Sequence, residues 1–320
     1  MRLMSLLSRG LLCGLVISFA STASAQTWPQ RGVRLITPLG PGSGMDVTAR
    51  TFAERLSAKW GQPVVVENRQ GADGILAVQS FLSDRDNHSL MFAFAGLLSI
   101  NPLVHGDKLP YDVRDVVPVA SAIDSTLALT VSETMKIDTL AEFIKAAKER
   151  PGQLNWAATT GLPLYVVAAL QKSTGIDITQ IAYRDFAPAF QDFATGRVQL
   201  LATGINLLLP QVRSGRGKFL MVTNSARSPL APDVPTPAEA GFPELSFNGV
   251  NGFYGWRDMP ESLKARIAAD VREIANDPAI AERLKPTGST MRPGNAAEFA
   301  AAIEEQRAKV AAVAQAVAAK

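Results

Sequence analysis

Short apolar runs alternate with segments of helical periodicity along most of the chain. Residues 33–37 (VRLIT) and 89–94 (SLMFAF) are mostly apolar and predict strands. Between them, apolar residues recur at spacings of four, three and four residues and form one helical face: Met45, Ala49, Phe52 and Leu56. Successive strand–turn–helix units predict a mostly parallel sheet covered by helices, with ligands at the carboxyl ends of the strands.

A second series of these units begins near residue 138. Thr139 and Glu142 have the spacing of a capping box and precede an apolar helical face, which ends at Pro151 and Gly152. A strand, a turn and another helix follow, with Pro163 placed as a first-turn proline. We therefore expect a second sheet with its own helices.

The proline-rich residues 227–244 carry no block of charge, which favours an ordered surface loop on the second sheet's side. Asn295 and Glu298 have capping-box spacing before the last helix, which we expect to pack back on the first half of the molecule.

Residues 38–50 (PLGPGSGMDVTAR) place three glycines and two prolines between a strand and the start of a helix. Glycines let the backbone approach a ligand, and the unpaired N–H groups of a helix start favour an anion. The pattern is not a nucleotide-binding motif, because Val47 stands where GxGxxG requires glycine and no Gly-Lys-Ser/Thr follows. Asp46 would also repel a polyphosphate. A smaller anion suits this turn better.

A similar turn, Thr159-Thr160-Gly161, precedes the helix with Pro163 more than one hundred residues later. Another strand over residues 198–205 contains a Thr203-Gly204 turn. If the first two turns belong to separate lobes, their helix N-termini face one another across a cleft.

The first 25 residues have the pattern of an export signal. Arg2 and Arg9 flank the start, the apolar stretch GLLCGLVISFA follows, and the small residues Ala23-Ser24-Ala25 fit a cleavage site, so we expect a mature chain that begins at Gln26. An uncleaved membrane anchor is the alternative, but the apolar stretch is shorter than the roughly 20 residues that span a bilayer. The only cysteine, Cys13, lies in this segment, so the mature chain has neither a disulfide nor a thiol nucleophile.

Charge and residue content narrow the function further. The 320 residues include 32 basic and 29 acidic side chains, and removing the export signal leaves 30 against 29. Such a balance, with no basic stripe, argues against a nucleic-acid partner. A chain of this length usually forms two domains.

The supply of catalytic groups is small. The two histidines, His88 and His105, stand in polar loop segments, and no metal-ligand spacing is present. Ser43 is not at a nucleophile elbow, because Pro41 and Met45 replace the glycines of GxSxG. We expect a protein that is not an enzyme and that has neither a metal nor a cofactor.

Several segments, in their order and spacing, resemble the periplasmic solute-binding proteins of tripartite tricarboxylate transporters, often called Bug proteins. They include RLITPLGPGSGMDVTAR, GQPVVVENRQGADG, YRDFAPAFQDFATGRVQL, VTNSARSPLAPDVPTPAEAGFP and NGFYGW. The resemblance implies an α/β fold of the two-lobed periplasmic binding protein type, a type 2-like clamshell whose lobes are mostly parallel sheets joined by crossing hinge strands. Residues 26–126 and 249–320 would form the first lobe, and residues 127–248 the second.

The resemblance also implies a function. The protein would be a periplasmic, monomeric receptor that captures a small organic mono- or dicarboxylate and delivers it to the membrane permease subunits of a tripartite tricarboxylate transporter. A ligand sensor that passes its closed state to a signalling protein is one alternative. An exported enzyme that acts on a carboxylate in the same cleft is another.

In that family, backbone N–H groups and ordered waters at the strand–helix turns hold the solute carboxylate. The matching positions are Gly42, Ser43, Gly44 and Met45 in the first lobe and Thr159, Thr160 and Gly161 in the second. Asp46 would structure the first turn and complete the helix N-terminus. The remaining wall would comprise Phe94, Ala95, Gly96, Thr203 and Gly204.

This chain departs from the family at two places that line the expected site. Leu39 and Gly40 replace an aromatic–proline pair, whereas Leu162, Leu164 and Tyr165 replace small polar residues and a histidine. Because a buried polar group without a partner costs about 1–3 kcal/mol, a less polar cleft favours a less polar solute. The departures predict a carboxylate with an apolar body, aromatic acids included.

Overall fold

A computed structural model of the protein describes residues 28–183 and 186–318. The expected export signal lies outside the described residues, as do two residues of the YRDFAPAFQDFATGRVQL segment, Arg184 and Asp185. In the described part, no helix is both long and apolar enough to cross a membrane.

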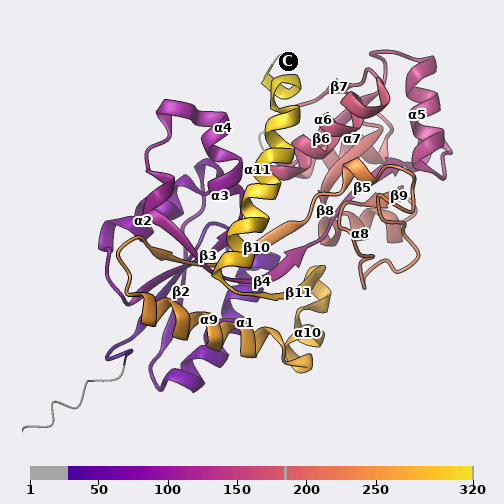
Figure 1. Ribbon diagram of the computed structural model, residues 1–320. Helices are drawn as coiled ribbons and strands as arrows, with labels where there is room; N and C mark the ends of the chain where they lie inside the picture. The colour runs from indigo at the N-terminus through magenta and orange to yellow at the C-terminus, as the bar shows by residue number, and fades with distance from the viewer. Residues whose placement is uncertain (1–27, 184–185, 319–320) are drawn as a thin grey trace, which may run out of the picture.

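Two separate sheets organise the chain (Figure 1). The first has six strands in the order β11-β4-β10-β3-β1-β2. Strand β1 pairs in parallel with β2 and β3, whereas β10 is antiparallel to β3 and β4, and β11 is antiparallel to β4. The strands span Val33–Thr37 (β1), Val64–Asn68 (β2), Ser89–Phe94 (β3), Val116–Ser125 (β4), Gly249–Trp256 (β10) and Ser289–Gly294 (β11).

The second sheet has five strands in the order β7-β6-β8-β5-β9. Strand β6 is parallel to β7 and β8, whereas β5 is antiparallel to β8 and β9. The strands span Leu127–Ser132 (β5), Asn155–Ala158 (β6), Thr179–Gln180 (β7), Leu200–Gly204 (β8) and Gly217–Val222 (β9).

The chain passes between the sheets at the end of β4. Only Thr126 separates β4 from β5, its N–H donates to Gly288 of the first half, and its carbonyl accepts from Ile205 of the second. The return follows β9, through the proline-rich loop to β10. Each sheet is therefore mixed, which corrects the expectation of mostly parallel sheets. Strands β5 and β10, which follow the two crossings between the sheets, pair antiparallel with their neighbours.

Helices cover the sheets as the apolar spacings predict. In α1, Phe52 is buried against Phe253 of the first sheet, with ring centroids 5.4 Å apart. Both capping boxes are present, at Thr139–Glu142 and at Asn295–Glu298. The helices span Gly44–Trp60 (α1), Ile75–Asp84 (α2), Gly96–Ser99 (α3), Asn101–His105 (α4), Leu140–Glu149 (α5), Leu162–Thr174 (α6), Ala187–Ala194 (α7), Ile205–Arg213 (α8), Glu261–Ala275 (α9), Pro278–Leu284 (α10) and Ala296–Ala318 (α11).

The proline-rich loop is held by its own contacts. Glu239 accepts from the Arg227 side chain at 2.9 Å and from the backbone and hydroxyl of Thr236 at 2.8 and 3.0 Å. The expected ordered loop is confirmed.

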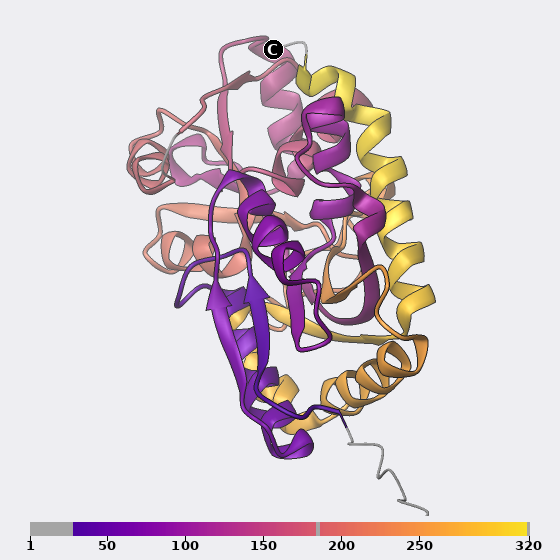
Figure 2. The same cartoon turned by 90° about the vertical axis from the view of Figure 1, so that its left-hand side faces the viewer.

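Helix α11 packs on both halves of the molecule. In both views it extends from the first half to the second (Figures 1 and 2). Phe299 and Ile303 join the apolar core beneath the first sheet, whereas Val310 and Val313 join that of the second. The expected packing on the first half is confirmed, and the helix also packs on the second half, because a helix of 23 residues is about 35 Å long and extends beyond one sheet.

Candidate functional site

The turn before α1 is organised by Asp46. Ser43 caps the helix and accepts from the Asp46 N–H at 3.2 Å. The Asp46 carboxylate accepts from the Gly42 N–H at 2.9 Å and from Asn68 Nδ2 at 2.8 Å, and it pairs with Arg50 at 3.0 Å. All of its partners belong to the protein, which agrees with the structural role expected of this carboxylate.

The protonation state of Asp46 follows from these contacts. Burial alone would raise the pKa of the carboxyl group, but hydrogen bonds from Arg50, Gly42 and Asn68 together hold it below its usual value. The carboxylate is therefore ionised at neutral pH. It stabilises the turn and the positive end of α1.

Two of the four backbone N–H groups in the first turn have no acceptor among the described residues. The Gly42 N–H donates to Asp46, and the Ser43 N–H donates to a carbonyl within the turn at 3.2 Å. In contrast, the N–H groups of Gly44 and Met45 have no acceptor among the described residues. Of the four predicted backbone donors, these two at the start of α1 are available to an anion.

The second turn lies at the ends of β6 and β8. The Thr159 N–H donates to the carbonyl of Ala202 at 3.3 Å, and its hydroxyl lies 3.0 Å from that of Thr203. Thr203 is only 1% exposed, so its buried hydroxyl supports the turn through this contact with Thr159. The predicted place of Thr203 and Gly204 in the wall stays a prediction.

Gly161 has a backbone conformation that suits glycine, with φ at 82°, and directs the chain into α6. The N–H of Leu162 has no acceptor among the described residues, whereas Pro163 lacks an N–H and Leu164 donates to Gly161 at 3.2 Å. The second turn therefore offers fewer helical donors than the first.

The predicted wall residues after β3 differ in accessibility. Phe94 is partly exposed, and its ring lies against the backbone of Gly74 and Gly96, where an added Cβ would come within 3.2 Å of it. Ala95 is fully buried and donates its N–H to Val250 at 2.9 Å. The Phe94 ring is thus the group that can contact a solute here.

The two halves approach one another at Gly44 and Asn206. A Cβ built on Gly44 would lie 3.8 Å from Nδ2 of Asn206, in the first turn of α8, and 3.4 Å from Cβ of Thr287. Sequence reasoning missed Asn206, although it is a polar residue at the start of the apolar run INLLL. Only the tertiary structure brings it opposite the first turn.

A second missed feature is the turn at residues 71–74 of the first half. Ala72 and Asp73 have φ values of 47° and 52° between two glycines that also have positive φ. Left-handed non-glycine residues are strained, and such strain concentrates at functional sites. The segment RQGADG contains the signal, since two glycines flank the turn.

Tyr165 of α6, in the second half, interacts electrostatically with Asp73 of this turn. Burial, and then the negative charge of Asp73, raise the pKa of the Tyr165 hydroxyl. The phenol therefore stays protonated well beyond neutral pH. The neutral phenol of the second half is thus within electrostatic reach of Asp73 in the first half.

Apolar side chains dominate the rest of the region. Leu39 is 40% exposed, and Leu162 and Leu164 are partly exposed at the start of α6. Leu162 and Leu164 also pack against the apolar core of the second half.

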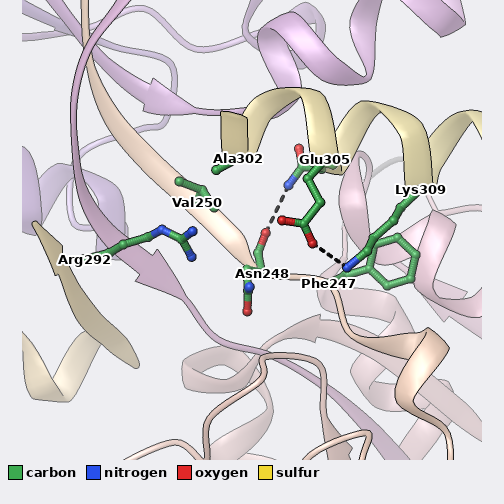
Figure 3. Close-up of a pocket in the computed structure, with 8 residues that line it drawn as sticks. Phe247, Asn248, Val250, Arg292, Ala302, Glu305 and Lys309 are labelled. Carbon is green, nitrogen blue, oxygen red and sulfur yellow. Dashed lines mark hydrogen bonds and ion pairs between the residues drawn. The ribbon is translucent and has the colours of Figure 1, made fainter. Parts of the chain in front are cut away.

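A small pocket between α11 and the start of β10 is a weaker candidate (Figure 3). None of the predicted turn residues lines it. Its polar groups are occupied by one another or by neighbours, since Lys309 pairs with Glu305 at 2.8 Å and Gln306 donates to the carbonyl of Asn248 at 3.0 Å. Nor do the described residues include a group of three or more His, Cys, Asp or Glu side chains placed to hold a metal ion.

Comparison with known proteins shows which family this chain resembles. A family model described as tripartite tricarboxylate transporter family receptor matches residues 48–318. A UPF0065 protein of Bordetella bronchiseptica is 34% identical over 305 residues, which cover 94% of this chain and 90% of that protein.

Two solved structures align over nearly the whole chain. An R. palustris protein with adipate is 27% identical, has a TM-score of 0.78, and is matched over 90% of this chain and 97% of its own. MatC from Rhodopseudomonas palustris with bound malate is 26% identical, has a TM-score of 0.72, and is matched over 88% and 99%. These likenesses confirm the two-lobed clamshell fold of periplasmic binding proteins.

Proposed function

This chain belongs to the tripartite tricarboxylate transporter receptor family, and on that premise we propose that it is a periplasmic receptor for a small organic carboxylate. The observation that carries the proposal is that the N–H groups of Gly44 and Met45 have no acceptor among the described residues, at the place where Gly44 comes close to Asn206 of the second half. The carboxylate-bound structural neighbours support the same solute class.

The physical argument rests on complementary charge between two lobes. The start of α1 presents free donors and a partial positive charge, and a carboxylate supplies the matching acceptor. A solute that also contacts the second lobe binds the closed form better than the open form, so binding favours closure. Capture and release then need no covalent chemistry, in keeping with a protein that is not an enzyme.

The body of the acid is apolar in this proposal. In the proposed site, Leu39, Leu162, Leu164 and the Phe94 ring contact the solute, and burial of apolar surface against them is favourable by about 25 cal/mol per Å². A solute with several hydroxyl groups would leave those groups without partners. Aromatic and longer aliphatic acids therefore fit better than compact hydroxy acids.

The remaining parts of the proposal concern partners and location. Residues 1–25 direct the chain to the periplasm, and the closed receptor, a monomer without a cofactor or metal, delivers its acid to the permease subunits of a tripartite tricarboxylate transporter. Family membership supports these statements.

A thermal-shift screen followed by calorimetry tests the solute class. We expect terephthalate, benzoate or adipate to stabilise the purified protein more than succinate or malate, and native mass spectrometry to find the bound acid unmodified. Stabilisation by succinate and malate alone would contradict the apolar-body assignment. Turnover of a bound acid would contradict the receptor assignment.

A further inference from the structure

Asn206 is a side chain of the second half that lies beside the first turn, with its Nδ2 3.8 Å from the position of a Cβ on Gly44. It follows the α8 cap residue Gly204, and the N–H of Ile205 is fixed to the crossing residue Thr126 at 2.9 Å. The position of Asn206 is therefore set by the strand crossing between the lobes. The distance between Asn206 and Gly44 therefore depends on how the two halves are placed relative to one another.

The orientation of the Asn206 carboxamide suits an anion. Its Oδ1 turns back over Gly204, where an added Cβ would lie 2.7 Å away, and its Nδ2 turns toward Gly44. The Nδ2 group thus lies beside the residue whose N–H, like that of Met45, has no acceptor among the described residues. Donors that converge from two sides without an acceptor between them favour a negatively charged group at that point.

No described residue satisfies this amide. Asn206 is only partly exposed, stands beside Leu207 and Leu208, and makes no side-chain hydrogen bond within the described residues. The amide is therefore accessible to solvent and to a ligand. A structural role for the amide has no contact to support it.

We propose that Asn206 is a specificity-determining residue of the site: its Nδ2 donates to the solute carboxylate that the Gly44 and Met45 N–H groups bind. This inference rests on the proposed function. In this arrangement the second lobe binds the anion through the Asn206 side chain as well as through the predicted backbone donors of residues 159–161. Selection of an ionised acid over its neutral ester or amide follows from this arrangement.

Isothermal titration of adipate, terephthalate and benzoate into wild-type protein and three variants tests the inference. For each acid that binds the wild type, Asn206→Ala should weaken binding roughly 10- to 100-fold, the range for loss of a hydrogen bond to a charged group. Asn206→Asp, which has the same shape but a negative charge, should weaken binding more than alanine does. Leu207→Ala, at the adjacent exposed position, should stay within about twofold of wild type.

The relative order of the Asp and Ala variants separates ligand contact from support of the fold. A supporting role predicts that the isosteric Asp is the milder change, so that result would overturn the inference, as would an Asn206→Ala affinity within twofold of wild type. Urea unfolding identifies a variant that does not fold, in which case Asn206→Ser replaces it. If wild-type protein binds none of the three acids, the proposed solute class fails, and the inference with it.

Discussion

The hydroxyl groups of Thr159 and Thr203 lie 3.0 Å apart and hydrogen-bond at the ends of the parallel strands β6 and β8. The bond fixes the second turn to the strand that leads to α8. Replacement of Thr203 by valine keeps the shape and should cost about 1 kcal/mol of unfolding free energy. We expect the affinity for an acid to fall several-fold, measured by titration calorimetry. Thr159→Val and the double variant form a cycle, in which additive effects would show that the bond has no role.

Substitution of Gly44 tests the first turn directly. Gly44→Asp places a carboxylate beside Thr287 and Asn206, where the solute carboxylate is proposed to lie, and repulsion between like charges should reduce binding at least 100-fold. The fold should persist, because Gly44 has helical backbone and a Cβ would meet its neighbours at 3.4 Å or more. Val47→Asp, on the exposed face of the same helix, is the control. Unchanged affinity of Gly44→Asp would move the site elsewhere.

Acid should remove the contribution of Asp46 to stability. The folded pKa of this carboxyl group lies below its unfolded value of about 3.9, so the stabilisation is fully present above that value and is lost as pH falls through the folded pKa. Asp46→Asn should therefore cost roughly 1–2 kcal/mol at pH 7 and less at pH 3, measured by urea unfolding. An equal difference at both pH values would contradict this account.

Helix α11 should stabilise the second half through Val310. This side chain is fully buried in the core of the second sheet, and Val310→Ala removes two methyl groups and leaves a cavity. The expected loss is about 2 kcal/mol of unfolding free energy, whereas Glu304→Ala, on the exposed face, should change it by less than about 0.5 kcal/mol. A neutral Val310→Ala would mean that the helix end is not held in this core.

Periodicity in the sequence was enough to predict the strand–turn–helix units. The α1 face of Ala49, Phe52 and Leu56 is buried, and both capping boxes form. The same reasoning passed over β4, β5 and β11. At β4 and β5 the chain crosses directly from one sheet to the other, and no periodicity within a segment reveals such a connection. The mixed sheets follow from that connectivity, which only the tertiary structure reveals.

Prediction of the site was limited for a different reason. The turns at residues 39–46 and 159–162 could be located from glycine, proline and helix starts. Which N–H groups stay free could not, because Asp46 reaches back to Gly42 and leaves Gly44 and Met45. Asn206 lies 162 residues from Gly44 in the chain, so no local pattern joins them. The domain bounds and the site residues as a set stay predictions.

The attachment of α11 to both lobes has a consequence for how such a receptor can diversify. Enclosing a nutrient requires one lobe to turn against the other, and a rod anchored on each of them either resists or favours that rotation. Mutations along the rod would reset the free-energy gap between open and closed forms while every contact to the nutrient stays the same. Evolution could in this way adjust how much nutrient is needed for uptake without changing which nutrient is chosen.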